Sequence, residues 1–456
     1  MRAGFALMTD FYEFTMAAGY FENHFNPKAT FELYCHTLPP ERSYLLACGL
    51  PEIVRYIHHL RFTSAEVRYL RALPAFKNVS PGFFEYLRAF KFSGNVWAMP
   101  EGEVCFANEP VLQIEAPIIE AQLLETYLLS MINIQTLVAS KAARIVRAAQ
   151  CDGKVRAVID FGSRRAHGPA AGVLAARGAY IGGCFGTSNV QAGRLYKIPV
   201  LGTMAHSWVQ AFNNEEAAFK SYQNVFPQNT ILLVDTYDTI QAVHRAVALK
   251  RAFSGVRLDS GDLLALSLRV RRILDRAGRT GVKIIASGNL DEYKIQTLVE
   301  NKAPIDIFGV GTEMVVSGDA PSLDLTYKLV QLETRQGSVS YTAKLSCGKH
   351  TIPGRKQVYR TFDAGHQFKK DIITLAGESA PGGAQPLLMP LIRRGRTLQA
   401  LPSLAEARAR VQDNLRRIPS RFLRLKQPPV YPVEYSPEIR AVSRAVHQRG
   451  KKHAGR

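Results

Sequence analysis

The sequence has no hydrophobic run long enough to cross a membrane. Of its 456 residues, 46% are hydrophobic and 21% are charged, as in ordinary globular proteins. No apolar stretch approaches the ~18 to 20 residues that a membrane-spanning helix needs. The first residues, MRAGFALMTDFYEF, become acidic too soon for a secretory signal. We therefore expect a cytoplasmic protein that has no membrane partner.

Cysteine is scarce, and so are the arrangements that usually make it functional. No CxxC pair and no neighbouring histidine cluster occurs, which argues against a structural zinc site or a disulfide framework and favours a reducing compartment. No nucleophile-and-base pair of the hydrolase type stands out either. The missing pair helps to identify the reaction only if that reaction needs no nucleophile and base. The six cysteines are Cys35, Cys48, Cys105, Cys151, Cys184 and Cys347.

Acidic residues are few compared with basic ones. The chain has 58 Lys and Arg against 38 Asp and Glu, a formal net charge of +20. Between Arg410 and Arg456 there are twelve basic and three acidic residues. We interpret the polar end, residues 441–456, as a disordered, solvated extension, with nucleic-acid binding as the less favoured alternative. The remaining excess is compatible with a site that holds several phosphates.

The first 130 residues mix helix and strand signals. Asp10 followed by Glu13 predicts a capping pair at a helix start, and an apolar stripe then recurs at helical spacing from Phe11 to Phe21. Tyr12 falls off this stripe and is free to face something else. Residues 93–117 read as short strands broken by glycine and proline, and residues 121–150 predict a long amphipathic helix.

From Val155 onward, seven apolar runs each end in glycine and polar residues, and their starts lie 20 to 31 residues apart. Strand, polar loop and helix repeating at this interval indicate parallel β/α units, most economically a β/α barrel. The eighth strand is unclear, and the YKLV segment near Tyr327 is a candidate, so an irregular barrel is expected. The seven runs are VRAVIDFGSRR, AYIGGCFGTSN, PVLGTMAHS, TILLVDTYDT, SGVRLDSGD, VKIIASGNLD and DIFGVGTE.

In a β/α barrel the chemistry gathers at the C-terminal ends of the strands, where every polar cluster of these runs would lie. The turns SGNL (287–290) and GVGT (309–312) follow consecutive late strands and favour phosphate binding, although a lone glycine turn is usually only a turn. Asp238 and Asp262 read best as helix caps. Asp235 and Asp259 end apolar runs and should point into the pocket, toward ribose hydroxyls or hydrated Mg²⁺. The arginines predicted at the same rim are Arg164, Arg165 and Arg257.

Six motifs in this order resemble nicotinate phosphoribosyltransferase, of the type II phosphoribosyltransferase family: DFGSRRAHG, GTMAHSW, VDTYDT, VRLDSGD, SGNL and FGVGTE. MTDFYEFTMAAGYF at the start and PGRKQVYR later add to the resemblance. It implies an α/β fold: an irregular β/α barrel joined to a second α/β domain built from both chain ends, usually in a homodimer. We accordingly divide the chain into an N-terminal α/β domain (1–130), a barrel domain (131–340), a C-terminal segment packing back on the first domain (341–440) and a basic tail (441–456).

The resemblance also implies the reaction and its cofactors. Nicotinate and 5-phosphoribosyl 1-pyrophosphate would give nicotinate mononucleotide and pyrophosphate for NAD biosynthesis, coupled to ATP hydrolysis and requiring Mg²⁺. The pyridine nitrogen is already a nucleophile at neutral pH, so no general base is needed. Positioned charges would instead stabilise the departing pyrophosphate and the charge that develops on the ribose.

Matching the motifs residue by residue assigns roles to particular side chains. By resemblance, Tyr12, Thr203 and Arg257 contact nicotinate, and His206 is the histidine that ATP phosphorylates. From the sequence alone, a packed structural histidine would be the better interpretation of His206. Asp235 and Asp259 are candidates for catalysis on the ribose and metal side. The residues assigned to phosphate or pyrophosphate are Arg164, Arg165, Gly288, Asn289, Gly309, Gly311 and Thr312.

Three rival interpretations stay open. A nicotinamide or quinolinate phosphoribosyltransferase is the nearest, although the arginine pair of DFGSRR and the VRLDSGD loop look more like the nicotinate enzyme. An unrelated phosphosugar aldolase or isomerase is disfavoured by the lack of a clear Schiff-base lysine at a strand end. A nucleic-acid binder would show steeply salt-dependent binding that is lost on deleting the residues beyond Arg440.

Overall fold

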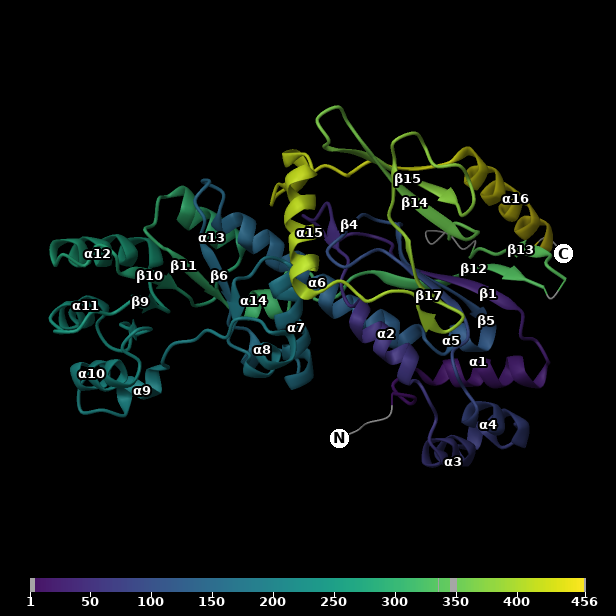
Figure 1. The fold of residues 1–456 in the computed structure, drawn as a ribbon, viewed down its shortest axis with the longest axis horizontal. Helices are drawn as coiled ribbons and strands as arrows, with labels where there is room; N and C mark the ends of the chain where they lie inside the picture. The colour runs from purple at the N-terminus through teal and green to yellow at the C-terminus, as the bar shows by residue number, and fades with distance from the viewer. Residues whose placement is uncertain (1–4, 335, 345–350, 455–456) are drawn as a thin grey trace. The chain divides into compact units, whose positions relative to one another are not determined.

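The chain folds into two compact units, whose elements are labelled in Figure 1. The computed structural model describes residues 5–334, 336–344 and 351–454. The first unit combines both chain ends, residues 1–136 and 322–456, and the second is the continuous stretch 137–321. The boundary between the units falls within α6 (Glu125–Ala149). The predicted second α/β domain built from both chain ends is thus confirmed.

The core of the first unit is a seven-stranded sheet in which every neighbouring pair is antiparallel. β1 pairs with β12 on one side and with β5 on the other, so both ends of the chain share one sheet. Phe31 of β1 stacks on Tyr327 of β12 with ring centroids 4.8 Å apart. In spatial order the strands are β13 (Val339–Tyr341), β12 (Leu325–Glu333), β1 (Lys28–Cys35), β5 (Pro110–Pro117), β3 (Asn95–Ala98), β17 (Met389–Arg393) and β18 (Arg396–Thr397).

Two smaller sheets, seven further α-helices and two short 3₁₀ helices, η1 (Pro74–Phe76) and η3 (Ser420–Leu423), complete the regular structure described in the first unit. β2 (Leu45–Leu46) pairs with β4 (Val104–Cys105). The four-stranded sheet runs in the order β16 (Gln385–Pro386), β14 (Lys356–Phe362), β15 (Phe368–Leu375) and β19 (Val433–Tyr435). The helices are α1 (Phe11–Glu22), α2 (Leu50–His59), α3 (Ser64–Ala72), α4 (Pro81–Arg88), α5 (Ile118–Gln122), α15 (Leu404–Arg417) and α16 (Pro437–Ala454).

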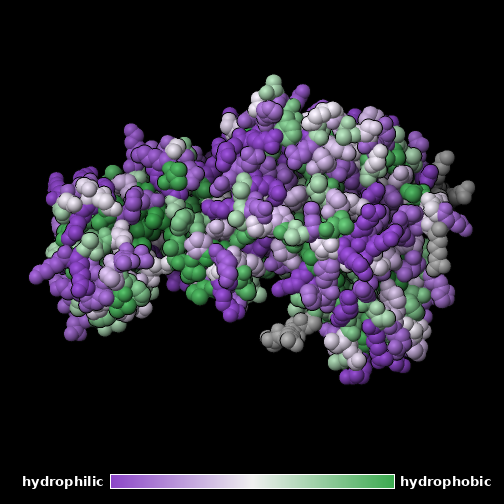
Figure 2. All heavy atoms as spheres, in the orientation of Figure 1, coloured by the Kyte–Doolittle hydropathy of each residue, from purple (hydrophilic) through white to green (hydrophobic). Residues whose placement is uncertain are grey.

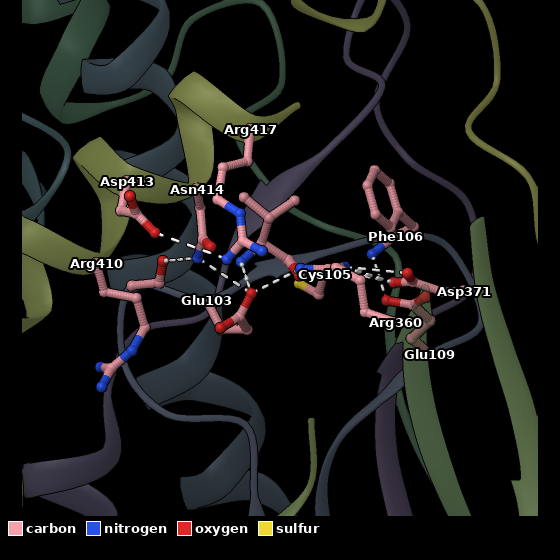
Figure 3. A network of polar contacts seen from close by, with 12 residues as sticks. Glu103, Cys105, Phe106, Glu109, Arg360, Asp371, Arg410, Asp413, Asn414 and Arg417 are labelled. Carbon is pink, nitrogen blue, oxygen red and sulfur yellow. Dashed lines mark hydrogen bonds and ion pairs between the residues drawn. The ribbon is translucent and has the colours of Figure 1, made fainter. Parts of the chain in front are cut away.

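A buried arginine joins the N-terminal and C-terminal parts of the first unit (Figure 3). Arg360, on β14, is only 1% exposed. Its Nη1 lies 2.6 Å from Glu103 Oε1, and its Nη2 lies 2.6 Å from Asp371 Oδ2. Asn414, on α15, donates to the same Glu103 oxygen at 3.0 Å. Because burial of these charges costs free energy unless they are paired, the cluster holds β14, β15, α15 and the residue before β4 in one arrangement.

Replacing Arg360 with alanine should lower the free energy of unfolding by about 3 to 5 kcal/mol, because Glu103 and Asp371 then stay buried without their cation. Urea denaturation of the full chain measures the change. Arg88→Ala is the matched control, since Arg88 pairs with Glu85 at the surface and its loss should cost less than about 1 kcal/mol. A similar loss of stability in the two variants would contradict this account of the cluster.

The second unit contains a parallel six-stranded sheet. Its strands are short and almost wholly apolar, as expected where helices cover parallel strands. In spatial order they are β7 (Gly186–Thr187), β6 (Ala157–Asp160), β11 (Ile307–Val310), β10 (Lys283–Ala286), β9 (Gly255–Leu258) and β8 (Ile231–Leu233). The main helices between them are α7 (Pro169–Ile181), α8 (Val190–Tyr196), α9 (His206–Gln210), α10 (Glu215–Val225), α11 (Thr239–Val247), α12 (Leu263–Arg276), α13 (Glu292–Glu300) and α14 (Thr312–Val315).

Five of these helices begin with an Asn or Asp whose side chain accepts a hydrogen bond from the backbone N–H three residues later. The predicted capping roles of Asp238 and Asp262 are confirmed, because they cap α11 and α12 in this way. Such caps fix where each helix starts and hence how long the preceding polar loop can be. The other three caps are Asn189, Asn214 and Asp291.

The seven predicted strands are largely, but not wholly, as expected. Val200 forms a parallel bridge to Thr187, which places the PVLGTMAHS run beside β7. No hydrogen-bonded pair joins that run to β8 within residues 137–321, so closure into a barrel stays a prediction. The first part of AYIGGCFGTSN belongs to helix α7, which ends at Ile181, and only Gly186–Thr187 form the strand.

Three other predictions were wrong. The YKLV segment is part of β12 in the antiparallel sheet of the first unit, not an eighth barrel strand. Asp10 and Glu13 do not form a capping box; Glu13 is fully buried and accepts a hydrogen bond from the backbone N–H of Thr126. Residues 441–454, predicted to be disordered, continue helix α16. The last two residues of that tail, 455–456, lie outside the described part of the chain, as does Cys347.

Within the described ranges, we find no helix that combines the length and the apolar character needed to cross a bilayer. Figure 2 shows hydrophilic side chains over much of the face in view, with smaller hydrophobic patches between them. Several of the exposed apolar side chains lie on or just before α1, among them Met8, Phe11 and Met16.

Candidate functional site

The polar residues that follow the strands of the second unit share one edge of its sheet. The strands are parallel, so their C-terminal ends all lie at the same edge. Asp235 follows β8, Asp259 follows β9, Ser287 follows β10 and Gly311 follows β11. β8, β9, β10 and β11 are neighbours in that order, so the loops after them lie side by side.

Arg257, on β9, is the centre of this site. Its side chain is 12% exposed, and it donates from Nε to Ser287 Oγ at 2.8 Å, from Nη1 to Thr203 Oγ1 at 3.0 Å and from Nη2 to Asp259 Oδ1 at 2.6 Å. The guanidinium carbon lies 5.4 Å from the centre of the Phe161 ring, after β6. Nη1 also donates to Met204 O at 3.5 Å, so one of the five N–H donors of the guanidinium remains for a ligand carboxylate. The predicted meeting of Thr203, Arg257 and Asp259 is present in the structure.

Asp259 is held ionised by its neighbours. Burial by itself would raise the pKa of Asp259, but the hydrogen bond from Ser287 and the charge of Arg257 outweigh that effect, and the pKa lies below its usual value. Ser287 is 2% exposed, and its hydroxyl accepts from Arg257 while donating to the Asp259 carboxylate. Ser287 therefore fixes the relative orientation of the arginine and the aspartate.

Ser287→Ala should raise the pKa of Asp259, because one of the interactions that lower it is removed. In the folded protein the carboxylate is ionised above its depressed pKa, and the ion pair is lost as the pH falls through that value. The acid limb of the pH profile of kcat/KM should therefore move to higher pH in Ser287→Ala. Ser254→Ala, at the opposite end of β9, is the control and should leave the profile in place. An unmoved acid limb in Ser287→Ala would contradict this role.

Asp235 carries the clearest unsatisfied polar atom of the site. Its Oδ2 accepts from the backbone N–H of Asp259 at 3.0 Å and from Ser260 Oγ at 2.6 Å. Its Oδ1 is buried and accepts no hydrogen bond from the described residues. A buried carboxylate oxygen without a partner is costly, so this atom is suited to a ligand that brings a positive charge or a donor.

His206 is the first residue of α9 and lies beside the aspartates. Its Nδ1 is 3.2 Å from Thr236 Oγ1, and its Nε2 is 3.7 Å from Asp259 Oδ2. The imidazole is 40% exposed, so it is accessible from solvent. Trp208 anchors the short helix, because its indole N–H donates to Ala218 O at 3.1 Å. His206 is therefore held in the site without being enclosed by the core.

The two glycine turns are needed first for packing. At Gly288, where φ is 95°, an added Cβ would lie 1.9 Å from the backbone oxygen of Asp259. At Gly309 an added Cβ would lie 2.5 Å from the ring of Phe161. Asn289 also has a left-handed φ, of 48°, and Gly311 precedes Thr312 at the start of α14. These contacts explain the glycines without an anion, so phosphate binding by the turns stays a prediction.

Arg164 and Arg165 lie on the short helix η2 (Ser163–Arg165) after β6, with exposed side chains. β6 is the next strand beyond β11, so these arginines follow the same sheet edge. Among the described residues, no hydrogen bond or ion pair links them to Arg257 or to the aspartates. Their strand is close to the site in the order of the sheet, and their role in binding phosphate stays a prediction.

Tyr12 belongs to the first unit, on α1. It is 43% exposed, and its hydroxyl hydrogen-bonds to the carboxylate of Glu125. Burial of the hydroxyl end and the charge of Glu125 raise the pKa of Tyr12, so the hydroxyl stays protonated at neutral pH. The expectation that Tyr12 is exposed and not part of the core is confirmed.

Sequence reasoning missed three polar residues that shape the site. Ser287 and Thr236 lay inside the quoted motifs but received no role, although a hydroxyl directly after an apolar strand is the signal that could have identified them. Asp160, at the end of β6, is 2% exposed and accepts from Thr187 Oγ1 at 2.7 Å and from Gly162 N at 2.8 Å. Asp160 therefore joins the loops after β6 and β7.

The fold and the site together define an α/β protein with a charged site at the C-terminal edge of a parallel sheet. Comparison with known proteins identifies its family. The nicotinate phosphoribosyltransferase (NAPRTase) family matches residues 157–361, its N-terminal domain matches residues 7–133 and its C-terminal domain matches residues 380–443. The chain belongs to the nicotinate phosphoribosyltransferase family, transferases of NAD biosynthesis.

Individual relatives agree over nearly the whole chain. It is 45% identical over 442 residues to the nicotinate phosphoribosyltransferase pncB2 of Mycobacterium tuberculosis. That alignment covers 95% of this chain and 92% of the relative. It is 38% identical to the nicotinate phosphoribosyltransferase of Bacillus subtilis, with 94% and 93% covered. The crystal structure of human nicotinic acid phosphoribosyltransferase superposes with a TM-score of 0.84 at 29% identity and covers 96% of this chain and 99% of that one.

Proposed function

We propose that this protein transfers a phosphoribosyl group from 5-phosphoribosyl 1-pyrophosphate to nicotinate, coupled to ATP hydrolysis. The observation that carries the proposal is the half-buried Arg257, held by Thr203, Asp259 and Ser287 at the strand edge of a chain from this family. A fixed guanidinium with an N–H donor to spare suits a carboxylate such as that of nicotinate.

Arg257 and Thr203 are the proposed contacts of the nicotinate carboxylate. The proposed role of Tyr12 is to lie against the pyridine ring. This role rests on the family resemblance, and the hydrogen bond to Glu125 supports it because that bond holds the phenol while the residue stays exposed. For the phosphates of the sugar, the proposed contacts are Arg164, Arg165, Gly288, Asn289, Gly309, Gly311 and Thr312.

The chemistry suits a site without a general base. The lone pair of the pyridine nitrogen attacks C1 of the ribose, a C–N bond forms, and the C–O bond to pyrophosphate breaks with its electron pair leaving on pyrophosphate. The cost lies in separating these charges. Asp259, kept ionised by Arg257 and Ser287, is the proposed group that stabilises positive charge on the ribose.

The residues present fit a bound Mg²⁺ ion. The described residues contain no cluster of three or more His, Cys, Asp or Glu able to enclose a metal. Mg²⁺, however, is commonly held by one or two carboxylates together with water and substrate phosphates, and Asp235 offers a buried oxygen without a partner. Asp235 and Asp259 are the proposed residues on the metal side, and the ion would neutralise charge on the departing pyrophosphate.

Asp235→Asn should raise the Mg²⁺ concentration needed for half-maximal rate by about tenfold or more, because a carboxylate on the metal side is lost. Excess EDTA should abolish turnover of the unmodified protein. The matched control is Asp238→Asn, the same change three residues later, since asparagine caps a helix as well as aspartate does. Equal Mg²⁺ requirements in the two variants would contradict the assignment of Asp235.

His206 is the proposed site of phosphorylation. A ring nitrogen would attack the γ-phosphorus of ATP, form an N–P bond and release ADP; water would later cleave that bond and release phosphate. The exposure of the imidazole and its position beside Asp259 support this role, because the charge of a phosphoryl group there would act directly on the site.

The direct test is incubation of the protein with nicotinate, 5-phosphoribosyl 1-pyrophosphate and Mg²⁺, with and without ATP. Nicotinate mononucleotide and pyrophosphate should form in equal amounts, and ATP should increase the yield while ADP and phosphate accumulate. Absence of mononucleotide under both conditions would overturn the proposed reaction. Mononucleotide formation that ignores ATP would overturn only the coupling.

A homodimer and a cytoplasmic location stay predictions from the resemblance and the composition. Nucleic-acid binding by the basic C-terminal end is not part of the proposal. Deleting the residues beyond Arg440 should spare catalysis.

A further inference from the structure

Asp160, the last residue of β6, carries a buried carboxyl group to which the proposed reaction gives no role. The residue is 2% exposed, and no cation pairs with it among the described residues. Its oxygens accept hydrogen bonds instead, Oδ1 from Gly162 N at 2.8 Å and Oδ2 from Thr187 Oγ1 at 2.7 Å. Burial raises the pKa of Asp160 in spite of these donors. A carboxyl group buried without a cation costs free energy, which points to a role in the loops that its hydrogen bonds join.

The bond to Gly162 fixes the loop after β6. The carbonyl of Gly162 accepts the backbone N–H of Arg165 at 2.8 Å, so the residue that Asp160 holds is also the one on which the turn η2 is built. Gly162 also packs on α14, where an added Cβ would lie 2.7 Å from Val315 Cβ. Since α14 begins at Thr312, this glycine joins the loop after β6 to the loop after β11.

The bond to Thr187 extends the same arrangement to the loop after β7. Thr187 Oγ1 accepts the backbone N–H of Asn189 at 2.9 Å while it donates to Asp160. Asn189 caps α8, so the start of that helix is held by the hydroxyl that Asp160 orients. The backbone adds a further contact, because Asp160 O accepts Ser188 N at 2.8 Å. One carboxyl group therefore holds three loops, those after β6, β7 and β11, which we call the phosphate half of the site.

Arg257 is held separately from the phosphate half. Its hydrogen bonds to Ser287, Thr203 and Asp259 involve none of the three loops that Asp160 joins. The Phe161 ring touches it from the loop after β6, with its centre 5.4 Å from the guanidinium carbon. Loss of the Asp160 carboxyl group should therefore disturb the phosphate half and leave the hydrogen bonds of Arg257 in place.

We propose that Asp160 is the positioning residue of the phosphate half of the site. It holds the three loops in an arrangement in which Arg164, Arg165 and Thr312 reach the phosphates of one substrate molecule together. Asp160 is buried and acts through the loops, not by touching the substrate. The inference rests on the proposed function, because that function supplies the phosphate roles of those three residues.

Steady-state kinetics and calorimetry of Asp160→Ala test the proposal. KM for 5-phosphoribosyl 1-pyrophosphate should rise by about tenfold or more, because hydrogen bonds to a carboxylate are lost. KM for nicotinate should stay that of the unmodified protein, because the contacts of Arg257 are kept. Titration with magnesium pyrophosphate, which needs no turnover, should show the same loss of affinity. Asp160→Asn should restore most of it, since an amide can accept from Gly162 N and donate to Thr187 Oγ1.

Asp306→Ala is the matched control. Asp306 also accepts a backbone N–H, that of Ile284 at 2.9 Å, but it lies before β11, at the opposite edge of the same sheet. Its loss should lower stability and change neither KM. A purely structural role of Asp160 would affect both substrates alike, so an equal rise of the two KM values would overturn the proposal.

Unchanged pyrophosphate affinity in Asp160→Ala would overturn it as well. Should that variant fail to fold, Thr187→Val, which removes one of the two donors, replaces it with the same criterion. Absence of mononucleotide formation by the unmodified protein would overturn the proposed reaction, whereas the pyrophosphate titration would still decide the role of Asp160. The two failures are therefore distinguishable.

Discussion

Replacing Arg257 with alanine should lower kcat/KM for nicotinate by about 100- to 1,000-fold, which corresponds to losing a preorganised charged donor. The expected loss is large because the guanidinium is the proposed carboxylate partner and also organises its neighbours, donating to Thr203 and Asp259. Steady-state kinetics with varied nicotinate at saturating 5-phosphoribosyl 1-pyrophosphate measure it.

Arg257→Lys should give an intermediate loss, because lysine keeps the charge but cannot donate in a planar fork. Arg272→Ala, an exposed arginine on α12 of the same unit, controls for the change in net charge and should leave kcat/KM unchanged. If Arg257→Ala retained more than about a tenth of the activity, the site would have to be placed elsewhere.

His206→Ala should abolish the coupling to ATP. ATP hydrolysis should fall by about 1,000-fold or more, because the proposed nucleophile is gone, and the rates of mononucleotide formation with and without ATP should become equal. After incubation with ATP labelled in the γ-phosphate, the unmodified protein should carry an acid-labile label and His206→Ala should carry none.

His244→Ala is the matched control, since His244 is an exposed histidine on α11 of the same unit. Its label and its ATP response should match those of the unmodified protein. Label retained on His206→Ala, or ATP stimulation retained without any label, would show that the phosphoryl group goes to another residue or to none.

The parallel strands and the polar edge could be predicted from the sequence because both follow from local patterns. Apolar runs that end in glycine and polar residues, spaced 20 to 31 residues apart, leave few folds other than parallel β/α units. The position of the polar residues at one edge of the sheet then follows because the strands are parallel. On that basis the sequence predicts that four residues lie together: Thr203, Asp235, Arg257 and Asp259. The caps Asp238 and Asp262 were equally local, and they were confirmed.

The predictions that failed depended on long-range partners. The YKLV segment has the apolar character of a barrel strand, but it is β12 that pairs antiparallel with β1, almost three hundred residues earlier in the chain. Glu13 has the spacing of a capping residue, yet Thr126 of the long helix α6 provides its hydrogen bonds. Neither partner can be read from the sequence near the residue concerned.

The roles of small residues were the hardest to predict. Glycine in the two turns was interpreted as room for an anion, which stays a prediction, and the missing side chains of Gly288 and Gly309 also make room for Asp259 and Phe161. Ser287 stood in a recognised motif, but its bridge between Arg257 and Asp259 becomes visible only when the two neighbouring strands β9 and β10 are assembled. Contacts of this kind depend on distances of a few ångströms, which sequence patterns do not encode.

The most direct test of the central claim, that Arg257 selects a pyridine with a single carboxylate, is a competition among nicotinate, nicotinamide and quinolinate in one reaction with 5-phosphoribosyl 1-pyrophosphate, ATP and Mg²⁺. The account predicts that kcat/KM for nicotinate exceeds that for either competitor by about 100-fold or more, because nicotinamide lacks the charge that the arginine pairs with and quinolinate adds a second carboxylate. Equal or faster use of nicotinamide, or consumption of quinolinate with release of carbon dioxide, would contradict it.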